Sequence, residues 1–175
     1  MQPGDVIENP VTGHRYEVVH SGRDTAGALL EMLADFPPGV PEPPDHCHPR
    51  QEERFELLEG TLELRVAGVR RQLRAGESLV IPAGTRHAMW TTPTTSARAR
   101  WQTRPALRSA DFFATAARLA GEGRLRSDGT PDLWDAALLL RTYRDEFRLG
   151  SPPPVLQGVV FGILAAVARL MGRRL

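Results

Sequence analysis

The sequence predicts a mainly β domain over residues 1–106, followed by a helical appendage over residues 107–175. Two observations carry this division. Before Pro105, short apolar runs are separated by turn residues at the interval expected of a β-sandwich or barrel. After Pro105, apolar residues recur at helical spacing. At 175 residues the chain is long enough to bury a core of its own.

Eight apolar runs are candidate strands, and turn signals such as NPVTG, PPGVPEPP and PAGT separate them. Along residues 61–66 apolar and polar side chains alternate, which is typical of a half-buried antiparallel strand. Glu59 and Gly60 are expected to form a turn before this strand. The candidate strands are residues 15–19, 28–34, 54–58, 62–66, 70–74, 78–81, 87–91 and 97–103.

Three helices are predicted in the second part of the chain. Ser109 is expected to N-cap the first helix. Thr130 is expected to N-cap the second, which would continue to Gly150. The third helix, residues 155–172, is apolar around most of its circumference, so a membrane-spanning helix has to be considered. Its uncharged centre is about a dozen residues, short of the ~20 that a bilayer requires. Packing on the barrel or on a partner subunit is therefore expected, and with it a homodimer.

Composition and charge exclude several classes of function. The net charge of +1 predicts no nucleic-acid-binding surface. Cys47 is the only cysteine, so an internal disulfide is impossible and nothing requires an oxidising compartment. The first ten residues lack the basic and apolar regions of a signal peptide. A cytoplasmic protein whose partner is a small molecule is the resulting expectation.

The segment PPDHCHPRQEERFELLEG contains the first candidate site residues. His46 and His48 are two residues apart, so on a strand they share a face at a separation of ~7 Å. Glu53 follows across a turn and faces the same side as Phe55 and Leu57. His87 opens a later strand, after PAGT. Three imidazoles and one carboxylate on a rigid sheet suit a borderline divalent transition metal.

These residues carry a resemblance to the cupins, small β-barrels with two signature motifs. The first motif matches Gly39, His46, His48, Glu53 and Gly60, with an opening spacer one residue longer than usual. The second matches four residues in register, while a threonine stands where asparagine is common. These five positions are Gly76, Pro82, Gly84, His87 and Thr91.

The resemblance covers about residues 4–105 and implies a double-stranded β-helix, the jelly-roll barrel. It also implies four metal ligands, His46, His48, Glu53 and His87, that hold one Fe, Mn, Ni or Zn ion. His-x-His alone also occurs by chance on exposed strands. Glu53 and His87 in register favour the metal site over that alternative. A barrel that binds metal weakly, or a ligand without metal, stays open.

The resemblance leaves the function between two classes. A quercetinase-like dioxygenase is favoured first and a metal-dependent isomerase or cyclase second, with Glu53 as a ligand that also accepts a proton. The alternative is a non-catalytic binding or sensor module. Phe55, Leu57 and Met89 are expected to line the substrate pocket. His14 and His20 are expected to be ordinary surface or strand residues, and Trp101 to pack on the barrel exterior or at the helix interface.

Overall fold

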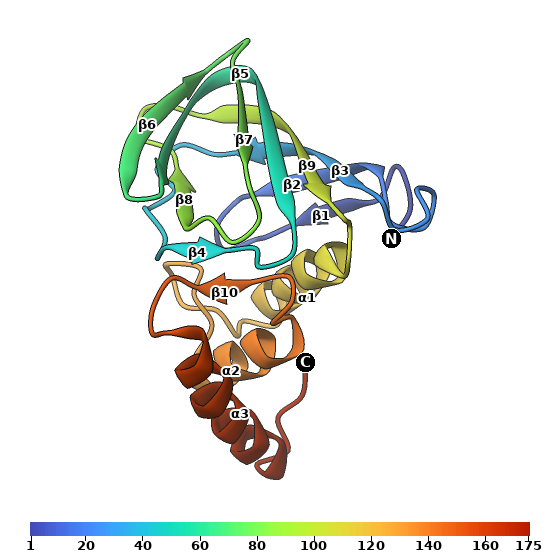
Figure 1. The fold of residues 1–175 in the computed structure, drawn as a ribbon, viewed down its shortest axis with the longest axis vertical. Helices are drawn as coiled ribbons and strands as arrows, with labels where there is room; N and C mark the ends of the chain where they lie inside the picture. Colours follow the sequence, from blue (N-terminus) through green and yellow to red (C-terminus); the bar gives the residue numbers. More distant parts are fainter.

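Ten strands and three helices make up the computed structural model, which describes residues 1–175 (Figure 1). The strands form a barrel, and the helices lie together below one end of it. The elements are β1 (Val6–Glu8), β2 (Arg15–His20), β3 (Leu30–Phe36), β4 (His46–Cys47), β5 (Glu52–Val66), β6 (Val69–Arg74), β7 (Ser78–Ile81), β8 (His87–Trp90), β9 (Ala97–Arg104), α1 (Ser109–Gly121), α2 (Leu133–Thr142), β10 (Arg148–Leu149) and α3 (Pro154–Leu170).

The barrel is a double-stranded β-helix in which the strands pair antiparallel in the order β1-β2-β3-β9-β5-β8-β4-β10. Strand β5 is shared between the two halves of the barrel. Its first half pairs with β9 and β7, and its second half pairs with β6 and β8. One long strand thus contributes to both faces of the barrel, so side chains from its two halves meet inside.

Strand β5 bends at Gly60. The turn predicted at Glu59 and Gly60 is not formed, because the two predicted strands are one continuous strand with a register shift between Leu57 and Glu59. Gly60 has a φ of 75°, and a Cβ there would lie 1.9 Å from the carbonyl oxygen of Ser96. Only glycine fits a positive φ and so close an approach of backbone. The strand therefore bends there without ending.

The main core fills the barrel with side chains from both of its faces. Alternate residues of β3, β5 and β9 point inward, as the period-2 pattern predicts for half-buried strands. The inward set includes the completely buried Phe55, Leu57 and Leu62. Two smaller clusters join α2 to α3 and α2 to α1. The apolar interior holds the strands rigidly around any polar residue placed among them.

The helices begin and end differently from the prediction. Asp132, not Thr130, caps α2, because its side chain accepts the N–H groups of Trp134 and Asp135 at 3.0 and 2.9 Å. Ser109 is the first residue of α1 and bonds Gln51 instead of capping. Helix α2 stops at Thr142 rather than continuing to Gly150. The residues after it turn back to the barrel.

The returning segment forms β10, which pairs antiparallel with β4 (Figure 1). In this register Arg148 lies opposite Cys47 and Leu149 lies opposite His46. The helical appendage is therefore hydrogen-bonded to the strand that carries His46. Helix α3 packs on α2 through Ala165 and Ala168. None of the helices is long and apolar enough to cross a bilayer.

Candidate metal centre

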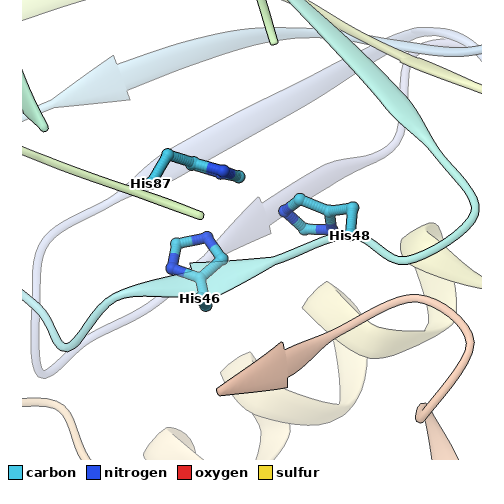
Figure 2. A group of neighbouring side chains, drawn as sticks. All are labelled: His46, His48 and His87. Carbon is cyan, nitrogen blue, oxygen red and sulfur yellow. The ribbon is translucent and has the colours of Figure 1, made fainter. Parts of the chain in front are cut away.

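Three histidine side chains converge inside the end of the barrel that faces the helices (Figure 2). His46 lies on β4 directly opposite His87 on β8, and their ring centroids are 4.4 Å apart. His48 follows β4, and its ring lies 5.3 Å from each of the other two. One nitrogen from each ring lies within 4.8 Å of the others. The three histidines are placed to hold one metal ion.

Glu53 reaches the same point from β5. Its carboxylate is 1% exposed, with Oε1 lying 3.2 Å from His48 Nε2 and Oε2 lying 3.0 Å from His87 Nε2. Strand alternation predicts this orientation, since Glu52 beside it is exposed. Trp101 Nε1 donates a 2.9 Å hydrogen bond to Glu53 Oε1. Trp101 therefore does not pack on the barrel exterior, because β9 turns its indole inward. Its expected packing at the helix interface is confirmed, since its ring meets Phe113 of α1 edge-on at 5.1 Å.

Backbone carbonyls determine which nitrogen of two rings faces the centre. His48 Nδ1 lies 2.6 Å from the carbonyl oxygen of Glu146, and His87 Nδ1 lies 3.0 Å from that of Thr85. A carbonyl only accepts, so each Nδ1 must carry the hydrogen. The Nε2 atoms of His48 and His87 are then left with bare lone pairs. This is the usual arrangement of a metal-ligating histidine, in which the second nitrogen is held by the protein.

Three buried polar atoms at the centre lack a hydrogen-bond partner: His48 Nε2, His87 Nε2 and Glu53 Oε2. The 3.0 and 3.2 Å contacts to Glu53 bring lone pairs against a carboxylate rather than donors against an acceptor. Such an arrangement is repulsive unless a cation or a proton lies among the atoms. The donor set of imidazole nitrogens and a carboxylate oxygen fits a divalent transition metal. The residues present are therefore chemically suited to bind a divalent metal ion.

The ionisation of the site follows from its burial and its mixed charges. Burial, and then the neighbouring His87 and His48, lower the pKa of His46 to about 3. Burial alone would raise the pKa of Glu53, but the three histidines outweigh it and hold that pKa below its usual range. Burial opposes the charged form of His87, but the carboxylate of Glu53 prevails and raises the pKa of His87. His46 thus keeps its lone pair free, beside an ionised carboxylate.

A cavity of about 260 Å³ opens onto His46 and His48. Phe147 stacks on the ring of His46 at 4.7 Å, and Phe112 stacks on Phe147 at 5.3 Å. The N-terminal hairpin supplies the opposite wall. A hollow of about 350 Å³ between α2 and α3 contains none of the candidate ligands. The cavity is lined by Thr12, His14, Tyr16, Phe36, Val40, Pro41, Pro43, His46, His48, Met89, Trp101, Phe112, Phe113, Asp128, Gly129, Thr130 and Phe147.

Of the three residues predicted to line the pocket, Met89 does so. Phe55 and Leu57 do not, because they lie deeper on β5 and are completely buried in the barrel core. Both residues pack in the core on the strand that carries Glu53.

Sequence reasoning did not predict that His14 and the helical appendage contribute to the cavity. His14, expected to be an ordinary surface or strand residue, stacks on Tyr16 and meets Phe36 edge-on at the cavity wall. Phe147 and the carbonyl of Glu146 reach the centre from a segment about 100 residues away in the sequence.

One family model matches part of the barrel. Residues 32–102 match the family model described as "Cupin domain". This stretch contains His46, His48, Glu53 and His87. The comparison with curated proteins finds no match.

Several solved structures are similar to the chain. The Cnp3 cupin domain of Schizosaccharomyces pombe is 11% identical, with a TM-score of 0.49 over 61% of this chain and 72% of that one. KdgF from Halomonas sp. is 19% identical, with a TM-score of 0.47 over 57% and 86%. An RmlC-like cupin from Shewanella frigidimarina is 23% identical, with a TM-score of 0.49 over 59% and 86%.

Proposed function

The chain carries a cupin domain over residues 32–102, and we propose that it uses one divalent transition metal ion to act on a small organic molecule. His46, His48 and His87 would hold the ion, with Glu53 as the fourth ligand. The observation that carries this proposal is the meeting of unpartnered Nε2 and Oε2 atoms at the base of an aromatic cavity. Fe, Mn, Ni and Zn all suit such a donor set.

A bound ion would supply an open coordination position, either for Lewis-acid activation of a chelating substrate or for reaction with O₂. The chain's own residues supply the rest. Trp101 holds Glu53 Oε1 and leaves Oε2 directed at the centre. Glu53 is then also the proton acceptor nearest to a bound substrate. The stacked rings of Phe147 and Phe112 exclude water from one side of the cavity.

The reaction we favour is oxygenation of the quercetinase type, with metal-dependent isomerisation or cyclisation second. The alternative is a binding or sensor module that releases its ligand unchanged. At about 260 Å³ the cavity is smaller than the ~300–1,000 Å³ usual for ligand pockets. This size favours a substrate with one ring, or a short conjugated chain, over a flavonoid with three rings.

Turnover separates these candidates. Iron-, manganese- and nickel-loaded protein would be supplied with single-ring catechols and cyclic diketones while O₂ uptake and product are measured together. Uptake of one O₂ per ring opened supports the dioxygenase. An isomeric product without O₂ uptake supports the isomerase. A ligand that binds and is recovered unchanged from every metal form supports the module and contradicts the enzyme. Glu53→Gln is the matched variant, since it keeps the shape of the side chain and removes its basicity.

We also propose a homodimer in which α3 is covered by α3 of a second copy. Eight of the chain's thirteen exposed large hydrophobic residues lie on or directly after this helix. Five of them follow alternating spacings of four and three, which is the seam of a coiled coil. The five are Leu156, Val160, Ile163, Val167 and Leu170.

The seam contains no charge, and Arg169 is the only charged residue of α3, so two copies would not repel each other along it. Light scattering on the purified protein tests the dimer. Ile163→Glu would place two carboxylates in the seam and is expected to give monomers that keep their metal. Leu133→Glu is the control, because Leu133 is a comparably exposed residue on α2. A wild-type monomer at micromolar concentration would contradict the dimer.

A further inference from the structure

The wall of the metal cavity contains no permanently cationic side chain. All 22 basic residues of the chain are arginines, and none of them is among the seventeen residues that line the cavity. Apart from histidines, the only titratable groups in the lining are Tyr16 and Asp128. Glu53 adds a second carboxylate beneath the histidines. Although the chain has 22 arginines, none of them lines the cavity, so the cavity lacks the cations with which a protein usually binds an anion.

The remaining histidine of the lining does not supply a positive charge. His14 Nδ1 is hydrogen-bonded to Thr12 Oγ1 at 2.8 Å, and its ring is packed between Tyr16 and Phe36. Burial lowers the pKa of His14 to about 4. At neutral pH the imidazole is therefore an uncharged hydrogen-bonding group.

Asp128, at the mouth of the cavity, is negatively charged. Its Oδ1 accepts hydrogen bonds from the hydroxyl of Thr130 at 2.6 Å and from the backbone N–H of Thr130 at 2.9 Å. These bonds lower the pKa of the Asp128 carboxyl, the hydroxyl contributing more. They also hold the carboxylate in one place beside Gly129, whose φ of 80° keeps the loop tight against Thr12.

With a divalent ion bound, the metal centre would need one further negative charge to be neutral. A divalent ion with three neutral imidazoles and the Glu53 carboxylate leaves a net charge of +1. A singly deprotonated chelating ligand neutralises that centre. A second anionic group on the same ligand would be pushed against aromatic rings, without a cation to pair with and with Asp128 at the exit. Burying such an unpaired charge is costly.

We propose that the cavity selects planar chelating ligands that carry a single negative charge, such as a catechol monoanion or the enolate of a cyclic diketone. Asp128 is the residue at the mouth that rejects ligands with an additional carboxylate or phosphate. This inference rests on the proposed metal-dependent function and narrows its substrate class. Sugar phosphates and aromatic acids are excluded, and neutral phenols and diketones remain.

Two ligands of similar size distinguish the effect of ligand charge on affinity from the effect of ligand shape. We would titrate zinc-loaded protein under argon with 4-methylcatechol and with 3,4-dihydroxybenzoate, using calorimetry. Argon excludes O₂ and zinc is redox-inert, so neither ligand is oxidised. Each affinity is normalised to that for free zinc in the same buffer. We expect 4-methylcatechol to bind at least tenfold more tightly. Comparable normalised affinities would overturn the charge selection while leaving the chelating site intact. Failure of both ligands to bind would instead contradict the proposed function.

Asp128→Asn tests the assigned residue. Asparagine keeps the Oδ1 acceptor that Thr130 uses, so the loop is preserved while the charge is lost. The preference for 4-methylcatechol should fall at least threefold through tighter binding of 3,4-dihydroxybenzoate, with the affinity for 4-methylcatechol unchanged. The factor is modest because solvent screens a charge at the mouth. The control is Asp111→Asn, which removes an exposed carboxylate of α1 outside the lining. An unchanged preference in Asp128→Asn would overturn the role of Asp128.

Discussion

His48 donates a 2.6 Å hydrogen bond from Nδ1 to the backbone carbonyl of Glu146, across 98 residues of sequence. This bond joins the barrel to the helical appendage at the metal centre itself. Glu146 is held in turn, because its side chain is buried and its Oε1 accepts the N–H of Arg108 at 3.2 Å. The appendage therefore orients a candidate ligand in addition to covering the end of the barrel.

The tautomer of His48 is the first prediction. The carbonyls of Glu146 and Thr85 require a hydrogen on Nδ1 of His48 and His87 in the metal-free protein at pH 8. Long-range ¹H–¹⁵N correlation spectra would identify the tautomer of each ring. His20, which is exposed and pairs with Asp24, is an internal reference. A neutral ring with its hydrogen on Nε2 and none on Nδ1 would contradict the orientation described for the site.

Phe147 is expected to contribute to metal affinity without touching the ion. Its ring stacks on His46 at 4.7 Å and limits the rotation of that imidazole. Phe147→Leu should raise the metal dissociation constant by roughly tenfold, the lower end of the effect of residues that support ligands. Competition with a chromophoric chelator would measure it.

Phe36→Leu is the matched control for this prediction. Phe36 lines the same cavity, but its recorded ring contact is with His14 rather than with a metal-binding histidine. Its effect on metal affinity should stay below about threefold, even though it costs stability. Equal losses of affinity in the two variants would show that general packing, and not the stacking on His46, is responsible.

Gly60 is expected to be critical for stability. Alanine there would meet a positive φ and a carbonyl oxygen 1.9 Å from its Cβ. Gly60→Ala should lower the free energy of unfolding by roughly 3 kcal/mol, or prevent folding. Gly68→Ala is the control, because Gly68 has a φ of 81° but nothing within 4 Å of the added Cβ. Similar losses in urea denaturation would mean that the strain at φ, not the close approach, dominates.

Stability should depend on pH through His14. The unfolded chain binds a proton at His14 near pH 6.5, whereas the folded protein binds it only near pH 4. Between these values the unfolded state holds more protons, so the free energy of unfolding falls as the pH falls. After allowance for partial exposure, His14 should account for roughly 2 kcal/mol between pH 7 and 4.5.

His14→Gln isolates this contribution from that of His46, whose pKa is also depressed. Urea denaturation of both proteins, in chelator, at pH 7 and pH 4.5 makes the comparison. The variant should lose less stability on acidification than the wild type. Equal losses in the two proteins would show that His14 titrates normally in the folded state.

The local parts of this molecule follow from the sequence. Alternation along residues 52–57 separates the buried Glu53 from the exposed Glu52 without reference to the rest of the chain. The two-residue spacing of His46 and His48 predicts that they share a face, whereas their convergence with His87 is what the resemblance to the cupin motifs implies. These features depend on period and turn chemistry, which a short segment specifies by itself.

The remaining parts depend on contacts that no short segment specifies. Thr130 and Asp132 are both good caps two residues apart, and packing of Asp135 against Arg124 and Arg173 selects the later one. Helix α2 ends at Thr142 because pairing of β10 with β4 competes with its last turns. His14 and Trp101 turn inward only because other strands surround them.

Metal content is the measurement that decides whether the three histidines and Glu53 bind an ion. Untagged protein, purified without added metal and then loaded with Fe, Mn, Ni or Zn, would be analysed by elemental mass spectrometry beside His87→Ala and His20→Ala. We expect close to one equivalent of one of these metals per chain in wild type and in His20→Ala, and almost none in His87→Ala. A wild type that retains none of the four metals, or a His87→Ala variant that retains as much as wild type, would contradict this expectation.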